Sequence, residues 1–181
     1  MAPARLLTFS AERPVEPGRC RREGFEPPFT IDVPDGWFAF QDIPGFFDLE
    51  RDVGTLDVIA VQFARLSDVA SVATAADTIR ARPGLIVEGP TAIEVGGAPG
   101  VRLVVDAAGP DIEAQVFVPV LEIALGPISI ASGRRLELRL VDTAAGLLAV
   151  LLGGSVRTWE GAREAAEPIL ASIHFDSDHD S

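Results

Sequence analysis

The sequence predicts an α/β protein of the α+β kind, with a mainly antiparallel sheet and helices on both faces, arranged as an α/β/α sandwich. Three observations carry this prediction. Strand patterns precede each of two helix patterns, and most neighbouring strands are separated by short turns, which join antiparallel strands. Residues 147–152 are apolar at every position, as in a strand that is covered on both faces. The chain of 181 residues, 48% of them hydrophobic, can form one domain with a sizeable core.

The first strands of the predicted sheet come before the first helix. Residues 29–33 alternate between apolar and polar side chains, as a strand with one buried face does, and residues 37–40 return after a turn. Residues 41–54 are predicted to form a loop, because Pro44-Gly45 breaks the pattern. Residues 56–63 are strongly apolar and predict the next strand.

The first helix is expected to begin at Ser67 or Asp68, whose side chains can accept a hydrogen bond from its first turn. Pro83-Gly84 is expected to end it. Its predicted buried stripe has helical spacing and consists of Val69, Val72, Ala73, Ala76 and Ile79.

Strands resume after this helix. Residues 85–87, 91–95 and 101–105 are predicted strand segments, and the last two have the pattern of hairpin arms. Residues 112–125 have an extended pattern that Pro119 interrupts, which predicts a sheet edge or a bulge there.

The C-terminal part is predicted to form strand, turn, strand, helix and strand in that order. Residues 134–141 alternate, and residues 142–146 have turn chemistry. Gly153-Gly154 is expected to end the apolar strand at residues 147–152. Within that strand we expect three side chains to be almost fully buried: Leu147, Val150 and Leu152.

The last helix is expected to begin at Trp159 and to cover the sheet. Pro168 lies inside it, and a proline there removes one helical hydrogen bond and clashes with the carbonyl four residues earlier. The sequence therefore predicts a kink near Glu164 or a break into two short helices.

Residues 29–175 are predicted to be one domain, after a flexible Pro- and Arg-rich arm at residues 1–28 and before a polar tail at residues 176–181. The arm could lie on the acidic body or mark the chain for an acidic partner. Cys20 is the only cysteine, so an internal disulfide is excluded. We expect its thiol to be exposed and idle.

The net charge of −12 limits the classes of partner. It disfavours nucleic acid, whose binding depends on neutralising phosphates, and it disfavours an anionic membrane surface. No segment has the roughly 20 apolar residues of a membrane span. The chain is expected to be cytoplasmic if Met1 is the native start, and exported if a leader has been removed.

Three short segments resemble the PsbP-like superfamily, which includes photosystem extrinsic proteins, a Ran-binding import factor and LpqN-type bacterial lipoproteins. They are residues 29–37 (FTIDVPDGW), 94–102 (EVGGAPGVR) and 166–175 (AEPILASIHF). The resemblance spans roughly residues 28–176, although residues 112–133 have no place in the family pattern. It implies an α/β/α sandwich around an antiparallel sheet. By analogy of fold it also implies a non-enzymatic role in binding proteins.

No pattern in the sequence predicts a catalytic residue, a cofactor or a metal. A nucleophile–histidine site would need His174 or His179. His174 is predicted to be a structural or surface histidine, and His179 is predicted to lie in a solvated tail. Residues 48–52 carry alternate acids like a calcium loop, but Val53 stands where that loop needs glycine. A pair of carboxylates for acid–base chemistry stays open as an alternative, because 27 acids allow many pairings.

The feature with functional content is aromatic. Phe38 and Phe40 are predicted to share one strand face, and Trp37 the other. Phe46 and Phe47 are adjacent in the predicted loop, so at least one of them is expected to be exposed beside a groove. Exposed aromatic side chains next to acids favour a binding patch. The alternative is that all five rings are core under a covering loop.

The sequence thus predicts a non-enzymatic binding or accessory domain. Its partner would be a protein, a second copy of the chain or an apolar ligand, held by a patch of Phe46, Phe47, Phe38 and Phe40. One alternative is an enzyme for a small molecule with a carboxylate pair in a cleft. Another is a cytoplasmic chaperone for hydrophobic segments, which would need a long apolar groove.

Overall fold

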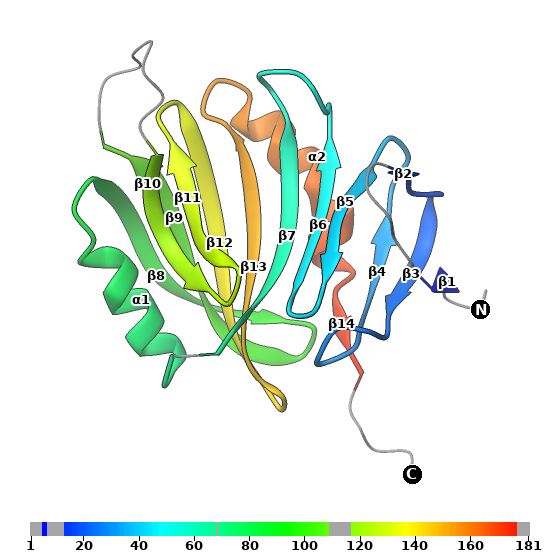
Figure 1. Ribbon diagram of the computed structural model, residues 1–181, viewed down its shortest axis with the longest axis horizontal. Coiled ribbons are helices and arrows are strands. Elements are labelled where there is room, and N and C mark those ends of the chain that lie inside the picture. The colour runs from blue at the N-terminus through cyan, green and yellow to red at the C-terminus, as the bar shows by residue number, and fades with distance from the viewer. Residues whose placement is uncertain (1–4, 7–12, 68, 109–116, 177–181) are drawn as a thin grey trace.

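One eight-stranded antiparallel sheet forms the centre of the protein (Figure 1). The computed structural model describes residues 5–6, 13–67, 69–108 and 117–176. The strands of the large sheet are, in spatial order, β2 (Arg13–Pro14), β5 (Phe38–Ile43), β6 (Phe46–Arg51), β7 (Ile59–Leu66), β13 (Gly146–Ser155), β12 (Arg134–Thr143), β9 (Ala98–Ala107) and β8 (Leu85–Val95).

Two smaller sheets and two helices complete the described part of the chain. The four-stranded sheet has the order β1 (Arg5–Leu6), β3 (Gly18–Arg22), β4 (Phe29–Val33) and β14 (His174–Phe175). The hairpin is formed by β10 (Phe117–Ile123) and β11 (Gly126–Ala131), and the helices are α1 (Val72–Arg80) and α2 (Trp159–Ala171). The prediction of an α+β protein with a mainly antiparallel sheet is confirmed.

The two faces of the large sheet carry two separate cores, as the alternation of β13 shows. Leu148, Val150 and Leu152 belong to a cluster that we call the aromatic core, which includes the buried side of α2 and the four-stranded sheet. Leu147, Ala149 and Leu151 belong to the aliphatic core, which includes α1 and hairpin β10–β11. In Figure 1, α2 lies behind the large sheet and the hairpin lies in front of it.

The expected burial of β13 is confirmed, since Leu147, Val150 and Leu152 are all buried. The α/β/α sandwich itself stays a prediction, because strands as well as a helix contribute to the core on each face.

The predicted loop at residues 41–54 is wrong. Most of it forms the hairpin of β5 and β6, with Pro44-Gly45 as the turn and a positive φ of 80° at Gly45. Pro44 and Gly45 are therefore turn residues between two strands, where glycine is favoured because it has no Cβ. Phe47 and Leu49 face the aromatic core, which is the period-two pattern of a strand.

Two further boundaries differ from the predictions. The N-cap of α1 is Ser71, whose side chain accepts a hydrogen bond from the Thr74 backbone at 3.1 Å, so the predicted start at Ser67 is wrong and Asp68 lies outside the described residues. Gly153-Gly154 does not end its strand, since β13 runs on to Ser155. A Cβ on Gly154 would come 2.9 Å from the Cβ of Ala162 in α2, so the glycine makes room for the helix.

α2 begins at Trp159, as predicted, and runs to Ala171 with Pro168 inside it. The predicted break into two helices is therefore wrong. Because Pro168 lies near the C-terminal end, a single missing hydrogen bond leaves the preceding turns intact. The kink near Glu164 stays a prediction.

The described residues 13–28 of the predicted arm are part of the fold. β3 pairs with β4 along its whole length, and Cys20 and Phe25 are buried in the aromatic core. The expectation of an exposed Cys20 is wrong, because the alternation of β3 turns this side chain inward. The domain boundaries at residues 28 and 176 stay a prediction.

Candidate functional site

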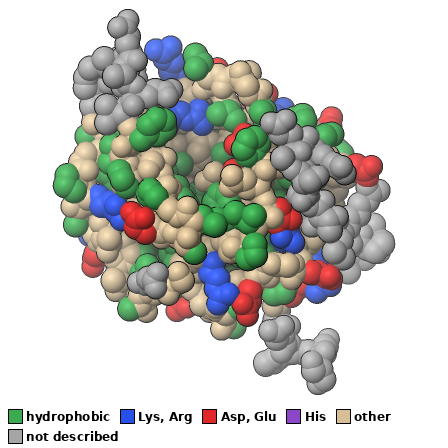
Figure 2. Space-filling view, in the orientation of Figure 1, with side chains coloured by type: hydrophobic (Ala, Val, Ile, Leu, Met, Phe, Trp, Pro, Cys, Tyr) green, Lys and Arg blue, Asp and Glu red, His purple; other side chains and the backbone are tan. Residues whose placement is uncertain are grey.

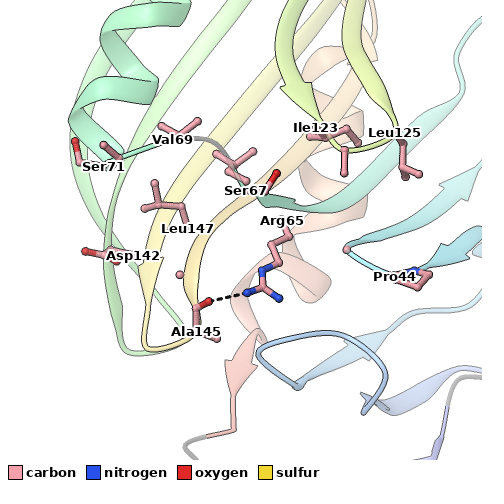
Figure 3. Close-up of a pocket in the computed structure, with 15 residues that line it drawn as sticks. Pro44, Arg65, Ser67, Val69, Ser71, Ile123, Leu125, Asp142, Ala145 and Leu147 are labelled. Atoms are coloured by element: carbon pink, nitrogen blue, oxygen red, sulfur yellow. Dashed lines mark hydrogen bonds between the residues drawn. The ribbon is translucent and has the colours of Figure 1, made fainter.

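The candidate site is a pair of adjoining cavities on the aliphatic-core side of the large sheet. The larger one, here named the turn cavity, has a volume of about 660 Å³ (Figure 3). Four parts of the chain meet around it: the β5–β6 turn at Pro44-Gly45, the end of β7 with the β7–α1 connection at residues 65–67 and 69–71, the β10–β11 turn at residues 123–125 and the β12–β13 turn at residues 142–147.

Local turn chemistry places these connections. Gly45 has positive φ, and so does Gly146 (φ 115°), so both turns close tightly at the rim. Thr143 Oγ1 donates a hydrogen bond of 2.6 Å to the carbonyl of Gly146, which fixes the second turn. Two of the four connections at the cavity are thus fixed by their own residues.

Arg65 supplies the positive charge of the turn cavity. Its guanidinium donates a hydrogen bond of 3.3 Å to the carbonyl of Ala145, across the cavity in Figure 3, and one of 2.6 Å to the carboxylate of Glu26. The Arg65 side chain is 41% exposed, so solvent reaches the group. Asp142, Ser67 and Ser71 also line the turn cavity, so apolar and polar groups together suit a ligand with an apolar body and a polar end.

The smaller one, here named the helix cavity, lies between α1 and β10 and has a volume of about 330 Å³. It shares Val69 and Ile123 with the turn cavity, so the two adjoin. Its floor is apolar, and a loose ion pair of Arg82 and Glu122 at 3.8 Å lies at its side. The remaining lining residues are Thr74, Ala75, Thr78, Ile79, Val120 and Leu121.

Apolar side chains reach the surface near both cavities. Leu125 at the β10–β11 turn is 55% exposed and lines the turn cavity. Figure 2 shows this side of the molecule, where hydrophobic side chains gather at the centre and charged groups lie mostly around them. Pockets of roughly 300–1,000 Å³ with mainly apolar walls are typical of small-molecule sites.

The structure does not bring the predicted aromatic patch to the surface. Phe46 and Phe47 are both buried, so the expectation that one of them is exposed is wrong. The reason is the hairpin: its two strand faces point into two different cores, so adjacent rings are hidden in opposite directions. Phe38 is half-buried and Phe40 is 37% exposed at a bulge of β5. A direct role of these four residues in binding stays a prediction.

Neither cavity can be recognised in the sequence, because residues from four separate parts of the chain line the larger one. Local patterns single out Pro44-Gly45, Ser67 and the turn at residues 142–146 one by one, but not that they meet. Of the predicted buried stripe of α1, Ile79 is confirmed as core and also lines the helix cavity, whereas Ala73 is exposed, so its place in the stripe is wrong.

A second feature that the sequence did not predict is the buried carboxylate of Asp48. Gln62 donates a hydrogen bond of 3.2 Å to one of its oxygens, and the other has no partner among the described residues. Burial raises the pKa of Asp48 to about 7, more than the Gln62 hydrogen bond lowers it, and the charge of Glu50 raises it further. Burial also raises the pKa of Glu50, which Arg134 partly offsets.

Asp48 and Glu50 are candidates for the carboxylate pair of the enzyme alternative, because both lie on one face of β6 and the charge of Glu50 raises the pKa of Asp48. Neither lines the turn cavity or the helix cavity. A raised pKa alone also occurs in structural sites.

The histidines, possible metal ligands and helices of the described residues were the other candidates for a site. His174 is exposed in β14, as predicted for a surface histidine, and His179 lies outside the described residues. Among the residues that the structure describes, no group of three or more His, Cys, Asp or Glu could hold a metal ion. Neither described helix is both long and apolar enough to cross a membrane.

Comparison with known proteins shows a likeness of structure only. No family model matches the sequence, and no curated protein matches it. The structure of PsbP (CyanoP) from Synechocystis sp. PCC 6803 is similar at a TM-score of 0.54 and 10% identity, over 90% of this chain and 95% of that one. LpqN of Mycobacterium tuberculosis, involved in cell envelope biogenesis, is similar at a TM-score of 0.50 and 12% identity, over 92% of this chain and 91% of that one. The chain has a PsbP-like fold.

This PsbP-like fold agrees with the resemblance of the three sequence segments. A protein of Bacteroides thetaiotaomicron VPI-5482 is also similar, at a TM-score of 0.44 and 9% identity over 84% of this chain, which spans 46% of that protein's length. At such identities the likeness concerns the fold, so the function has to be argued from the site.

Proposed function

We propose that this PsbP-like chain is a non-enzymatic binding domain that holds an apolar ligand, or an apolar segment of a protein partner, in the turn and helix cavities. The observation that carries the proposal is the adjacency of the two cavities, which share the lining residues Val69 and Ile123. Together they run from the turns at Pro44-Gly45 and Leu125 to the side of α1. The helix cavity has mainly apolar walls, and the turn cavity adds the charged side chains of Arg65 and Asp142 at the other end.

The surroundings support a binder over an enzyme. Catalysis by an acid pair needs the carboxylates within reach of a bound substrate. Asp48 and Glu50 line neither cavity. Each lining includes a single acid, Asp142 in the turn cavity and Glu122 in the helix cavity, and among the described residues no histidine lines either one. The α/β/α layering that the family resemblance implies is compatible with this role, since a helix packed on the sheet forms one wall of the helix cavity.

This proposal places the contact with a protein partner at the β5–β6 turn instead of at the rings of Phe46 and Phe47. The rings of Phe46 and Phe47 are core, but the turn that precedes them borders the turn cavity. A partner that enters the cavity would therefore touch Pro44 and Gly45, and Phe40 remains an exposed aromatic on the same hairpin. A second copy of the chain is the alternative occupant.

The test uses a neutral apolar fluorophore, N-phenyl-1-naphthylamine, added to the whole chain. We expect saturable fluorescence enhancement that Thr78→Phe removes, because Thr78 is exposed and lines the helix cavity. Arg80→Phe is the matched control, since it adds a phenyl ring to the same helix at an exposed position outside the cavity lining. Equal enhancement in both variants would contradict the proposal.

Two further measurements separate the alternatives. Light scattering of the free chain and of the chain with a saturating amount of the fluorophore tests whether a second copy occupies the cavities. Fractionation of the native cells separates the cytoplasmic from the exported location, which both stay predictions.

A further inference from the structure

A cluster of three arginines around one buried carboxylate lies apart from the cavities. Glu137 of β12 is 2% exposed, and the guanidinium groups of Arg102, Arg139 and Arg163 surround it. These come from three elements, β9, β12 and α2. The cluster lies on the sheet side of the aromatic core, since Glu137 and Arg139 alternate with the aliphatic-core residue Leu138.

One arginine is enough to pair with Glu137. Arg139 donates to Glu137 Oε1 from Nε at 3.0 Å, and its Nη2 lies 2.9 Å from the same oxygen. This is a strong charge-assisted arrangement that neutralises the carboxylate. Arg102 Nη1 and Arg163 Nε each lie 3.9 Å from Glu137 Oε2, which is beyond hydrogen-bonding distance.

The cluster therefore has an excess of positive charge. Glu160, the other acid within ion-pair distance of Arg163, lies 3.6 Å from it and is 85% exposed, so water screens this pair. Counting only groups within ion-pair distance, three arginines face two acids. In every other ion pair or ion-pair group among the described residues, the acids are at least as many as the arginines.

The sheet register makes the excess of positive charge unfavourable. Arg102 and Arg139 stand directly opposite one another on β9 and β12. Like charges in directly opposed positions are destabilising. The side chains of Arg102 and Arg163 are 39% and 44% exposed, because α2 packs mainly on β13, β4 and β7 and leaves this part of the sheet open. An anion in solution can therefore reach both groups.

The spacing fits one oxyanion. Since Arg102 Nη1 and Arg163 Nε both lie 3.9 Å from the same oxygen, they are at most twice that distance, 7.8 Å, apart. Two charge-assisted hydrogen bonds of about 2.7–2.9 Å each span roughly 5.5 Å through one oxygen atom, and more through two oxygens of one group. A bridging phosphate or carboxylate can contact both guanidinium groups.

We propose that Arg102 and Arg163 form a binding site for an oxyanion, a phosphate or carboxylate group, on the open face of β9 and β12 beside α2. Arg139 keeps Glu137 neutralised beneath the anion, so the other two arginines remain available. The site lies on the opposite side of the sheet from the turn and helix cavities and is independent of the proposed binding of apolar ligands.

The test is a titration of the isotope-labelled chain with sodium phosphate and, separately, sodium acetate, with sodium chloride keeping the ionic strength constant. We expect saturable shifts of backbone amide signals in β9, β12 and the first turns of α2. Saturation by phosphate alone assigns the site to phosphate groups, and saturation by acetate also assigns it to carboxylates. Saturation by neither overturns the proposal.

Variants test the two arginines directly. Arg102→Met with Arg163→Met should weaken the affinity at least about tenfold for each lost arginine, the usual effect of losing a hydrogen bond to a charged group. Arg80→Met with Arg157→Met is the control with the same charge change, because both residues are exposed and outside the cluster. Equal weakening in both pairs would reduce the effect to net charge and overturn the site.

Two gain-of-affinity variants keep the proposal testable if the arginine variant does not fold. Glu137→Gln and Glu160→Gln each remove a negative charge with little change of shape, so both should bind the anion more tightly than the parent. If neither does, Arg102 and Arg163 serve only to pair with these acids, and the proposal fails.

Discussion

The two faces of the large sheet use different side chains, and this difference decides where a guest can bind. The aromatic core contains seven Phe and Trp rings: Phe25, Phe29, Trp37, Phe47, Phe63, Trp159 and Phe175. The aliphatic core contains one, Phe46. Rings pack closely on the first face, where Phe29 and Phe63 stack with centroids 4.4 Å apart. On the second face, the helix cavity lies between α1 and β10, and the turn cavity adjoins it at Val69 and Ile123.

The comparison shows that a sheet face can be covered by other elements without the space between them being filled by side chains. Aromatic side chains are large enough to reach between the sheet and its cover. Alanine on the buried side of α1, at Ala75 and Ala76, does not extend far from the helix. We infer that one face of this PsbP-like chain stabilises the fold and the other binds.

The largest predicted effect compares two adjacent residues that point into the two cores. Phe47→Ala should lower the free energy of unfolding by about 3–5 kcal/mol, because Phe47 is fully buried against the rings of Phe29 and Phe63. Phe46→Ala should cost less, since Phe46 has no ring partner in the aliphatic core. Urea unfolding of the two variants measures the difference, and equal losses would contradict the contrast between the faces.

The next effect is a pH dependence caused by Asp48. The pKa of this carboxyl is about 7 in the folded chain, above its ordinary value of 3.8. The stability that the neutral carboxyl provides is therefore full below pH 3.8 and is lost as the pH rises through 7. The difference between the two values corresponds to about 4 kcal/mol as an upper bound. Asp48→Asn should unfold at higher urea than the parent at pH 8 and at the same urea near pH 4.

Removal of a less buried charge, that of Glu50, is the matched control for this prediction. Glu50→Gln on the same strand face should change the pH profile less, because Glu50 is only half-buried and Arg134 offsets part of its shift. If Asp48→Asn leaves the difference between pH 4 and pH 8 unchanged, the buried carboxyl finds a partner outside the described residues.

A smaller effect tests the contact between β13 and α2. Gly154→Ala should cost about 1–3 kcal/mol, because the new methyl group would come 2.9 Å from the Cβ of Ala162 and 3.3 Å from Trp159. Gly161→Ala is the counterpart in α2, where a Cβ meets nothing within 4 Å. This second change should stabilise the chain by about 0.5–1 kcal/mol, as alanine does inside a helix. Thermal unfolding distinguishes the two signs.

The sequence predicts the cores better than the cavities, and the reason is physical. Period-two alternation and helical spacing report which side of an element is buried, so Val150 in β13 and Trp159 in α2 were placed well from local pattern alone. The identity of the neighbour across the core is not encoded locally. Phe46 and Phe47 show this. With a core on one face of the sheet only, one of two adjacent rings in a strand would be exposed; here each face has its own core, so both are buried.

The boundary errors have a related cause. Gly153-Gly154 has the composition of a strand end, yet the strand continues because α2 packs close to this backbone. Ser67 and Ser71 are both suitable caps, and only the course of the chain around the turn cavity selects Ser71. The ion-pair cluster at Glu137 could be predicted least, since β9, β12 and α2 each contribute an arginine.

The most direct test of the contrast between the two faces is methyl NMR of the whole chain during titration with N-phenyl-1-naphthylamine. The methyl groups of Val69, Ile79 and Leu121 line the helix cavity and report on the aliphatic side. Those of Val61, Leu148 and Val150 lie in the aromatic core and report on the other side. We predict saturable shifts in the first group with the second group unchanged; shifts centred on the second group would contradict the assignment of stability to one face and binding to the other.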